Sequence, residues 1–168
     1  MIPRISILYV DDDPVLLELG RIFLEKNETF RVQTSTSVND ATALLAVNQY
    51  DVVVSDYQMP ERDGIEFLKY VRANHGGLPF ILFTGRGREE VVIEAINNGA
   101  DFYLQKGGDP VPQFAELSQK IRMAVEKRKT NEILRRQTVV LGERVKELNC
   151  LYRLAEAINI PGISLDDM

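Results

Sequence analysis

ISILYVDDD, at residues 5–13, is an apolar run that ends abruptly in three carboxylates. Six mostly apolar or β-branched residues are typical of a strand that is buried on both faces of a parallel sheet. Acidic residues directly after such a strand place charge at the edge of the sheet where α/β proteins form their sites. The stretch therefore predicts both a βα fold and the location of its site.

The same alternation of short apolar runs and helical patterns continues to about residue 108. Strands are expected at 5–10, 30–34, 51–55, 80–83 and 101–104, and helices at 14–26, 39–48, 65–74 and 89–98. Asp13 and Ser37 are expected to cap the first two helices, and Gly99 to follow the fourth. Repeated βα units predict an α/β fold with a doubly wound, five-stranded parallel sheet.

From Pro112 the pattern becomes an unbroken helical one that runs to about residue 159. Its first part has apolar residues three and four apart and is expected to pack on the sheet. Its second part has a heptad seam that predicts a coiled coil with a second copy of the chain. The seam consists of Leu134, Leu141, Val145, Leu148, Tyr152 and Ala155. Asn131, Thr138 and Gly142 weaken it, so a solvated tail remains an alternative.

We expect three parts: a compact domain at 1–127, a helical linker or coiled coil at 128–160, and the start of a truncated following module at 161–168. With 45% hydrophobic and 27% charged residues among 168, the composition is that of a folded chain. A net charge of -5 argues against general nucleic-acid binding. Apolar runs too short to cross a membrane, and the lack of a signal-peptide pattern, predict a cytoplasmic location without a membrane segment.

Four carboxylates are expected to converge at one sheet edge, with residues 11–13 after the first strand and Asp56 after the third. Such a cluster predicts a bound cation, because nearby like charges otherwise raise each other's pKa. Oxygen ligands favour a hard cation, and Mg²⁺ fits best. Thr84 and Lys106 follow the fourth and fifth strands, where a hydroxyl and an ammonium suit phosphoryl oxygens. Taken singly, each residue has a plainer explanation: Asp13 as a helix cap, Thr84 as a strand-end cap and Lys106 as a solvated loop residue.

These stretches resemble the receiver domain of two-component response regulators, over about residues 3–127. The matching segments are ILYVDDD (7–13), SDYQMP (55–60), DG (63–64), FTG (83–85) and GADFYLQK (99–106). The resemblance implies a flavodoxin-like sheet with strand order 2-1-3-4-5. It also implies a phosphoacceptor switch rather than an enzyme, with hydrolysis limited to its own acyl phosphate.

The resemblance further implies a role for individual residues. Asp56 would accept a phosphoryl group from a histidine kinase or a phosphotransfer domain. The Mg²⁺ ligands would be Asp11, Asp12, Asp56 and the backbone carbonyl of Gln58. The residues that bind the phosphoryl group and switch the domain would be Thr84, Lys106 and Tyr103.

Two features depart from the family pattern. Gly107 and Gly108 follow Lys106, where receivers usually have a proline after a cis peptide bond. A cis bond without proline costs about 3 kcal/mol, so either a trans bond in a glycine-adapted loop or a strained exception is expected. The helix after Pro112 resembles linkers of hybrid signalling proteins, so a hybrid sensor histidine kinase is expected as the parent.

Three other functions remain open. A degenerate receiver could serve as a dimerising scaffold without phosphorylation. A magnesium-dependent phosphatase of the haloacid dehalogenase type would use Asp11 and Asp13, but Val15 stands where that family has threonine. The basic stretch at 120–136 could contact nucleic acid, although no aromatic residues interleave with its charges. The single histidine, His75, is expected in the loop before the fourth strand and does not indicate a kinase.

Overall fold

Alternating strands and helices make up the computed structural model, which describes residues 4–26, 28–85 and 89–158. The strands are β1 (Ile5–Val10), β2 (Phe30–Ser35), β3 (Val52–Ser55), β4 (Phe80–Thr84) and β5 (Phe102–Gln105). The helices are α1 (Pro14–Glu25), α2 (Val38–Val47), α3 (Gly64–His75), α4 (Glu89–Asn97) and α5 (Pro110–Ile158). Every predicted element is present, with ends within two residues of the prediction. His75 is the last residue of α3, so its predicted place in a loop was wrong.

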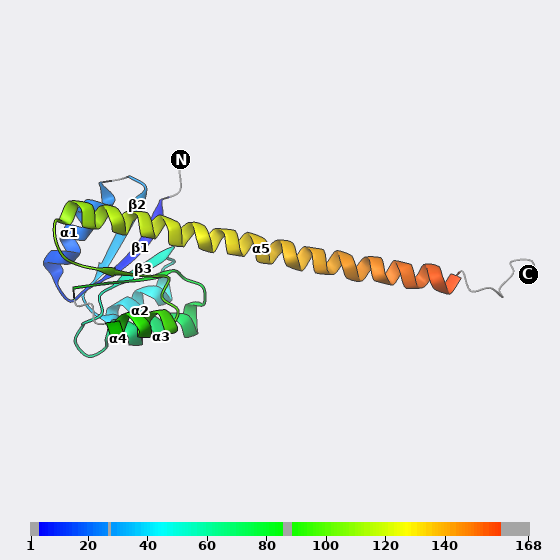
Figure 1. The fold of residues 1–168 in the computed structure, drawn as a ribbon, viewed down its shortest axis with the longest axis horizontal. Coiled ribbons are helices and arrows are strands. Elements are labelled where there is room, and N and C mark those ends of the chain that lie inside the picture. The colour runs from blue at the N-terminus through cyan, green and yellow to red at the C-terminus, as the bar shows by residue number, and fades with distance from the viewer. Residues whose placement is uncertain (1–3, 27, 86–88, 159–168) are drawn as a thin grey trace, which may run out of the picture. The chain divides into compact units, whose positions relative to one another are not determined.

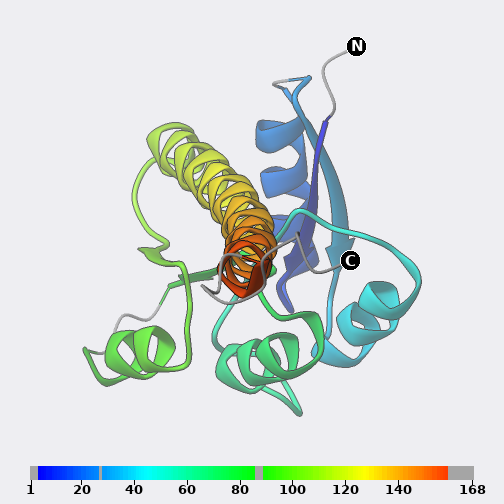
Figure 2. The ribbon, with the colours of Figure 1, turned by 90° about the vertical axis from the view of Figure 1, so that its right-hand side faces the viewer.

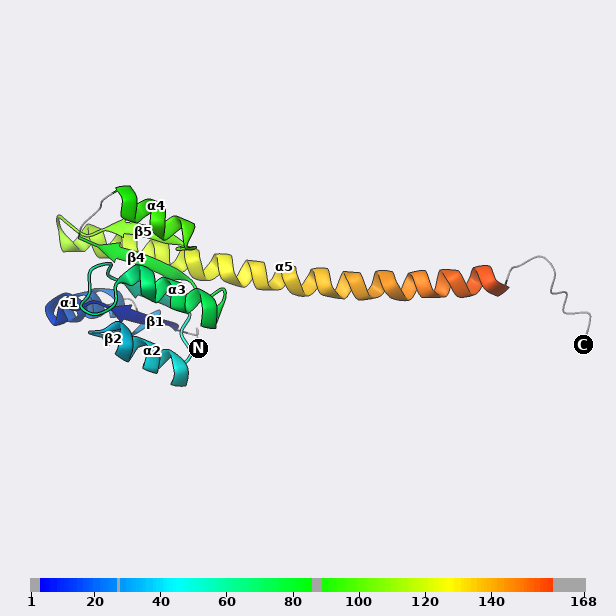
Figure 3. The same ribbon diagram turned by 90° about the horizontal axis from the view of Figure 1, so that it is seen from below.

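The strands form a parallel sheet in the predicted order, β2-β1-β3-β4-β5, and Figure 1 labels the first three of these. Seen from below, β2 and β5 lie toward opposite sides of this sheet (Figure 3). In β1, Val10 pairs with Ser35 on one side and with Ser55 on the other. Because the strands are parallel and in register there, the residues after β1 and β3 emerge at the same edge.

Helices cover both faces of the sheet. In β1, Leu8 and Val10 join the core under α2, α3 and α4, whereas Ile7 and Tyr9 join the core under α1 and the first part of α5. This alternation follows from the two-residue period of a strand. Figure 2 shows α2, α3 and α4 together on one side and α1 with the first part of α5 on the other. The two apolar layers fix the sheet edge that carries the acidic residues.

Side-chain caps set where three helices begin. Asp13 Oδ1 accepts from the backbone N–H groups of Val15 at 2.8 Å and Leu16 at 3.3 Å, as predicted for the start of α1. Ser37 caps α2, also as predicted. Asp63 forms a reciprocal capping box at the start of α3. These caps satisfy N–H groups that have no partner inside the helix.

The chain divides into two units, Met1–Arg128 and Lys129–Met168. The first holds the sheet and the buried residues of α5, from Phe114 to Val125. In the second, residues 129–158 are helical and all are exposed. The predicted start of a further module at 161–168 lies outside the described residues. None of the described helices combines the length and the hydropathy that a membrane span requires.

Candidate functional site

Backbone hydrogen bonds extend the sheet past the ends of β1 and β3 and bring two aspartates side by side. The Asp11 N–H donates to the Ser35 carbonyl at 3.1 Å, and the Asp56 N–H donates to the Val10 carbonyl at 2.9 Å. One carboxylate oxygen from each of Asp11, Asp12 and Asp56 lies within 4.8 Å of the others. Three of the four predicted carboxylates therefore form the cluster, whereas Asp13 caps α1.

The cluster is charged and mostly shielded from water. Asp11 is 1% exposed and Asp56 is 8% exposed, whereas Asp12 is open to solvent. Burial raises the pKa of Asp11, because water no longer stabilises its carboxylate. The Lys106 ammonium opposes this rise by donating a hydrogen bond to Asp11 Oδ2. Burial is the larger effect.

Lys106 connects the two buried carboxylates. Its Nζ donates to Asp11 and lies 3.4 Å from Asp56 Oδ1 in a looser ion pair. That Asp56 oxygen is buried and receives no hydrogen bond from a described residue. Among the described residues, Lys106 thus places one positive charge against three carboxylates. The excess of negative oxygen ligands fits a hard divalent cation such as Mg²⁺.

A residue with a hydroxyl stands at the same edge, at the end of β4. Thr84 is 1% exposed at the end of this strand, and its carbonyl accepts from the Lys106 N–H at 2.8 Å. The Lys106 side chain is largely covered, and its Nζ lies 5.6 Å from the centre of the Phe83 ring. The structure therefore brings Thr84 and Lys106 to the acidic edge, as the sequence predicts.

The loop after Lys106 is built on glycine. The described chain contains no cis peptide bond, so the bond to Gly107 is trans. Gly107 has φ +148° and Gly108 has φ +83°. Residues that carry a Cβ adopt such backbone angles only at an energetic cost. Of the two expected alternatives, the structure has the trans bond in a glycine-adapted loop.

The loop from β3 to α3 forms the open side of the site. It borders a cavity of about 380 Å³ that is lined by Asp12, Tyr57, Gln58, Met59, Pro60 and Asp63. Gln58 thus lies in the same cavity wall as Asp12. Glu61, in this loop, has φ +68°, and its carboxylate accepts from Asn39 Nδ2 of α2 at 2.9 Å. The loop thus contains a non-glycine residue with positive φ, a conformation that is costly for a residue with a Cβ, and it is joined to α2 by this hydrogen bond.

Gly64 is a residue of the site whose role sequence reasoning missed. Its N–H donates to the Tyr57 carbonyl at 2.8 Å, which brings the start of α3 against the backbone next to Asp56. A Cβ at position 64 would overlap the Asp56 carbonyl oxygen and approach Leu82 Cδ1 to 2.9 Å. The Asp63-Gly64 pair was a visible signal, but the sequence does not show which atoms press on the glycine.

Tyr103 on β5 faces inward. It packs against the core cluster under α2, α3 and α4, and its hydroxyl is buried without a hydrogen-bond partner among the described residues. Burial raises the pKa of this hydroxyl. The ring lies three residues before Lys106, so one short segment carries both side chains.

Comparisons with known proteins agree with this geometry. Residues 7–122 match the response regulator receiver domain family. The chain is 30% identical over 153 residues to response regulator Rre1 of Synechocystis sp.. The aligned residues make up 90% of this chain and 64% of Rre1. The chain is 34% identical over 104 residues to response regulator SaeR of Staphylococcus aureus, which covers 62% of this chain and 45% of SaeR. The chain thus spans about half to two thirds of the length of these relatives.

Solved structures share the fold. A signal receiver domain of an HD domain-containing protein from Pseudomonas fluorescens Pf-5 is 28% identical, with a TM-score of 0.69 over 76% of this chain and 98% of that one. A receiver domain protein from Clostridium thermocellum is 27% identical, with a TM-score of 0.67 over 75% and 98% of the two chains.

Proposed function

Because this chain belongs to the response regulator receiver domain family, we propose that it accepts a phosphoryl group on Asp56 and signals through a change in its own conformation. The observation that carries the proposal is the convergence of Asp11, Asp12 and Asp56 with Lys106 at one sheet edge. An Asp56 carboxylate oxygen attacks the phosphorus of a phosphohistidine on a histidine kinase or phosphotransfer domain. The phosphorus–nitrogen bond breaks, the histidine leaves, and an acyl phosphate remains on Asp56.

Bound Mg²⁺ supplies charge neutralisation for the phosphoryl oxygens. Asp11, Asp12, Asp56 and the backbone carbonyl of Gln58 would hold the ion. The excess of carboxylates over cations supports this assignment. So does the buried Asp56 oxygen that lacks a hydrogen bond from the described residues.

Lys106 and Thr84 respond to the new charge in this proposal. Lys106 already lies against Asp56, so its ammonium can pair with a phosphoryl oxygen attached there. The Thr84 hydroxyl donates to another phosphoryl oxygen and moves toward it. The ring of Tyr103 already faces inward in this structure, and in this proposal it follows the movement of Thr84, so that the surface formed by α4 and β5 changes. Hydrolysis by water ends the signal.

Intact mass spectrometry tests the proposal most directly. Incubation with acetyl phosphate and Mg²⁺ is expected to add the mass of one phosphoryl group, in a bond that base cleaves and that survives brief mild acid. Asp56→Asn should abolish the gain, as should removal of Mg²⁺, whereas Asp40→Asn, a change at an exposed carboxylate of α2, should leave it intact. A folded wild-type protein that gains nothing would favour the scaffold alternative, and a gain that survives Asp56→Asn would exclude Asp56 as the acceptor.

The other functions have less support. A phosphatase of the haloacid dehalogenase type needs Asp13 for proton transfer, but here Asp13 Oδ1 accepts two backbone hydrogen bonds at the start of α1. Rre1 and SaeR are response regulators, so a hybrid sensor kinase as the parent stays a prediction.

We also propose that the second unit pairs with a second copy of the chain. Its seam residues are more than half exposed: Leu134 at 54%, Leu141 at 60%, Val145 at 54%, Leu148 at 65% and Tyr152 at 64%. An uncovered apolar stripe of this length is unfavourable in water, and a heptad pattern is complementary to itself.

A further inference from the structure

Helix α4 is the most lightly packed of the helices on its face of the sheet. Two of its residues, Val91 and Ala95, are buried, whereas α3 beside it buries five. Its outer side exposes Ile93 at 59% and Ile96 at 62%. Helices with few buried contacts move at low cost, so α4 is the element of this face best suited to shift.

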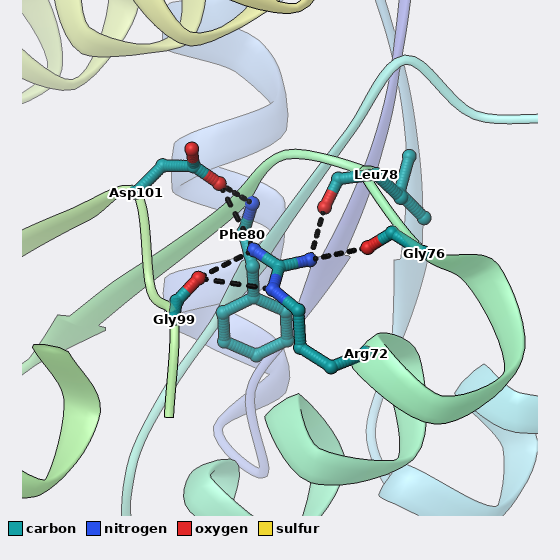
Figure 4. Close-up of polar contacts among 6 residues, drawn as sticks. All are labelled: Arg72, Gly76, Leu78, Phe80, Gly99 and Asp101. Carbon is teal, nitrogen blue, oxygen red and sulfur yellow. Dashed lines mark hydrogen bonds and ion pairs between the residues drawn. The ribbon is translucent and has the colours of Figure 1, made fainter. Parts of the chain in front are cut away.

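The C-terminal end of α4 is nevertheless held firmly. The Gly99 N–H donates to the Ile96 carbonyl at 3.0 Å, and the Ala100 N–H donates to the Ala95 carbonyl at 2.9 Å. Gly99 has φ +86° and its carbonyl faces Arg72 of α3 (Figure 4). Arg72 Nε and Nη2 donate to that carbonyl at 3.0 Å and 2.6 Å.

All three guanidinium nitrogens of Arg72 donate hydrogen bonds. Besides the two bonds to Gly99, its Nη1 donates to the carbonyls of Gly76 at 3.2 Å and Leu78 at 2.6 Å, and its Nη2 donates to Asp101 Oδ2 at 3.0 Å. These five bonds match the five N–H groups that an arginine offers. The fork thus joins the end of α3, the loop before β4 and the turn before β5 (Figure 4).

Asp101 ties the same point to the sheet. Its Oδ2 accepts from the Phe80 N–H at 2.9 Å as well as from Arg72, and its own N–H donates to the Phe80 carbonyl at 2.8 Å. Phe80 begins β4 and Asp101 directly precedes β5. The start of both strands is therefore fixed where Arg72 binds.

We propose that Arg72 is the fixed pivot of the conformational switch, about which α4 rotates with its C-terminal end held in place. Thr84 ends β4, and Glu89 begins α4 five residues later, so a movement at Thr84 reaches the end of α4 away from Arg72. At about 1.5 Å per residue, the helix gives a lever of roughly 12 Å. Ile93 and Ile96 move with it, whereas β5 keeps its start. The part of this inference that concerns movement of α4 on phosphorylation rests on the proposed function.

Hydrogen exchange of the full chain, followed by mass spectrometry, tests the pivot. In the wild type, phosphorylation with acetyl phosphate and Mg²⁺ should change the exchange of residues 89–94 and leave residues 98–102 unchanged. In unmodified Arg72→Met, residues 98–102 should exchange about tenfold faster than in the wild type. After phosphorylation of that variant, the change should spread from 89–94 into 98–102, because α4 then shifts as a whole.

Lys69→Met is the matched control. It removes the exposed contact of Lys69 with Glu94 at 3.5 Å, between the same two helices, and leaves Arg72 in place. Its exchange pattern should equal that of the wild type. Peptides from β1 and β3 should exchange alike in all variants, which separates a local effect from general destabilisation. If Arg72→Met does not fold, Arg72→Lys is used, since it keeps the charge but loses the fork.

Equal changes at 89–94 and 98–102 in the phosphorylated wild type would overturn the pivot. So would an Arg72 variant that exchanges like the wild type at 98–102. Intact mass of the same samples distinguishes this failure from failure of the proposed function. If no acyl phosphate forms, the proposed function is wrong, and the unmodified wild-type and Arg72→Met samples still decide whether Arg72 holds this end of α4.

Discussion

Asp11 is a buried carboxylate that lies against the Lys106 ammonium, yet burial still raises its pKa. Its folded pKa therefore exceeds its unfolded value of about 3.9, and the folded state holds its proton more tightly. This group costs stability at neutral pH. The cost disappears as pH falls through the raised pKa toward the unfolded value.

Asp11→Asn is therefore expected to increase the free energy of unfolding without Mg²⁺ at pH 7, by about 1 kcal/mol. Lys106 keeps Asp56 as a partner in this variant. The difference from the wild type should shrink as pH falls toward 4, because the wild-type carboxyl then becomes neutral in the fold. Urea denaturation in the presence of a chelator at several pH values measures both effects. Asp12→Asn is the control, since Asp12 is exposed and its removal should not stabilise the fold.

Mg²⁺ should make the wild type more stable than Asp11→Asn, which is the reverse of the order expected without the ion. A ligand stabilises the folded state in proportion to its binding, so added Mg²⁺ should raise the melting temperature of the wild type and have little effect on Asp11→Asn. An equal rise in both proteins would show that Asp11 does not help to hold the ion.

Gly64→Ala is expected to destabilise the first unit by about 2 kcal/mol, because the new Cβ would overlap the Asp56 carbonyl oxygen and backbone cannot move aside cheaply. The phosphorylation rate of Asp56 should fall with it, since α3 then pushes on the backbone that positions the carboxylate. Gly77→Ala, with no atom within 4 Å of the new Cβ, should do neither. Thermal unfolding and the intact-mass assay measure the two effects, and equal behaviour of the two variants would refute the steric argument.

At the residue scale, the sequence predicts the side chains that come directly after strands. Asp11, Asp56, Thr84 and Lys106 can be identified because parallel strands deliver the residues after them to one edge. Gly64 and Arg72 could not be assigned a role in this way. The contacts that constrain these two residues come from atoms distant in the sequence, and residue spacing does not predict such contacts.

At the scale of elements, α1 and β1 fit together through one small and one large residue. Gly20 of α1 faces the ring of Tyr9, and a Cβ there would overlap Tyr9 Cε1 and come within 3.1 Å of Phe114 Cε1. Tyr9 is fully buried, and its hydroxyl has no hydrogen-bond partner among the described residues. Burial also raises the pKa of this hydroxyl, so the phenol stays neutral.

Gly20→Ala is expected to destabilise the fold by roughly 1–3 kcal/mol, although alanine favours a helix by about 1 kcal/mol. Tyr9→Leu alone should also destabilise, through the lost ring contacts. The double variant should be more stable than the sum of the two changes predicts, because leucine leaves room for the alanine. A double-mutant cycle in urea measures this coupling, and strict additivity would show that the two residues do not press on each other.

The elements themselves could be predicted from the sequence, but not their precise ends. Strand β4 reads as a continuous apolar run, which is why the sequence predicts it. Helix α3 begins at Gly64 rather than at the apolar Ile65, because Asp63 and Glu66 form a capping box around its first turn. It includes His75 and ends where Gly76 adopts φ +52°. Caps are local side-chain geometry that hydrophobic periodicity does not report.

At the scale of the whole molecule, the two units differ in how they cover apolar surface. The first unit buries its apolar residues on both faces of the sheet. Residues 129–158 form a helix whose apolar side chains are all exposed. A second copy offers the same heptad seam, and a coiled coil would cover it.

The full chain is therefore expected to be a dimer in light scattering. Joint Leu141→Asn and Leu148→Asn substitution should yield a monomer, because both leucines lie in the seam and amides are costly to bury there. Val139→Asn, a change outside the seam on the same helix, should leave the dimer intact. A monomeric wild type would favour the solvated tail.

The direction of pairing can be tested by cross-linking across the seam. In a parallel, in-register pair, Leu148→Cys combined with Cys150→Ser should form an interchain disulfide on mild oxidation, because the two copies of position 148 then face each other. Cys150 in the wild type should not form one, because two residues beyond Leu148 it lies on the side of the helix away from the seam. A dimer in which the Leu148→Cys variant does not cross-link would point to antiparallel pairing, since the two copies of position 148 would then lie far apart along the seam.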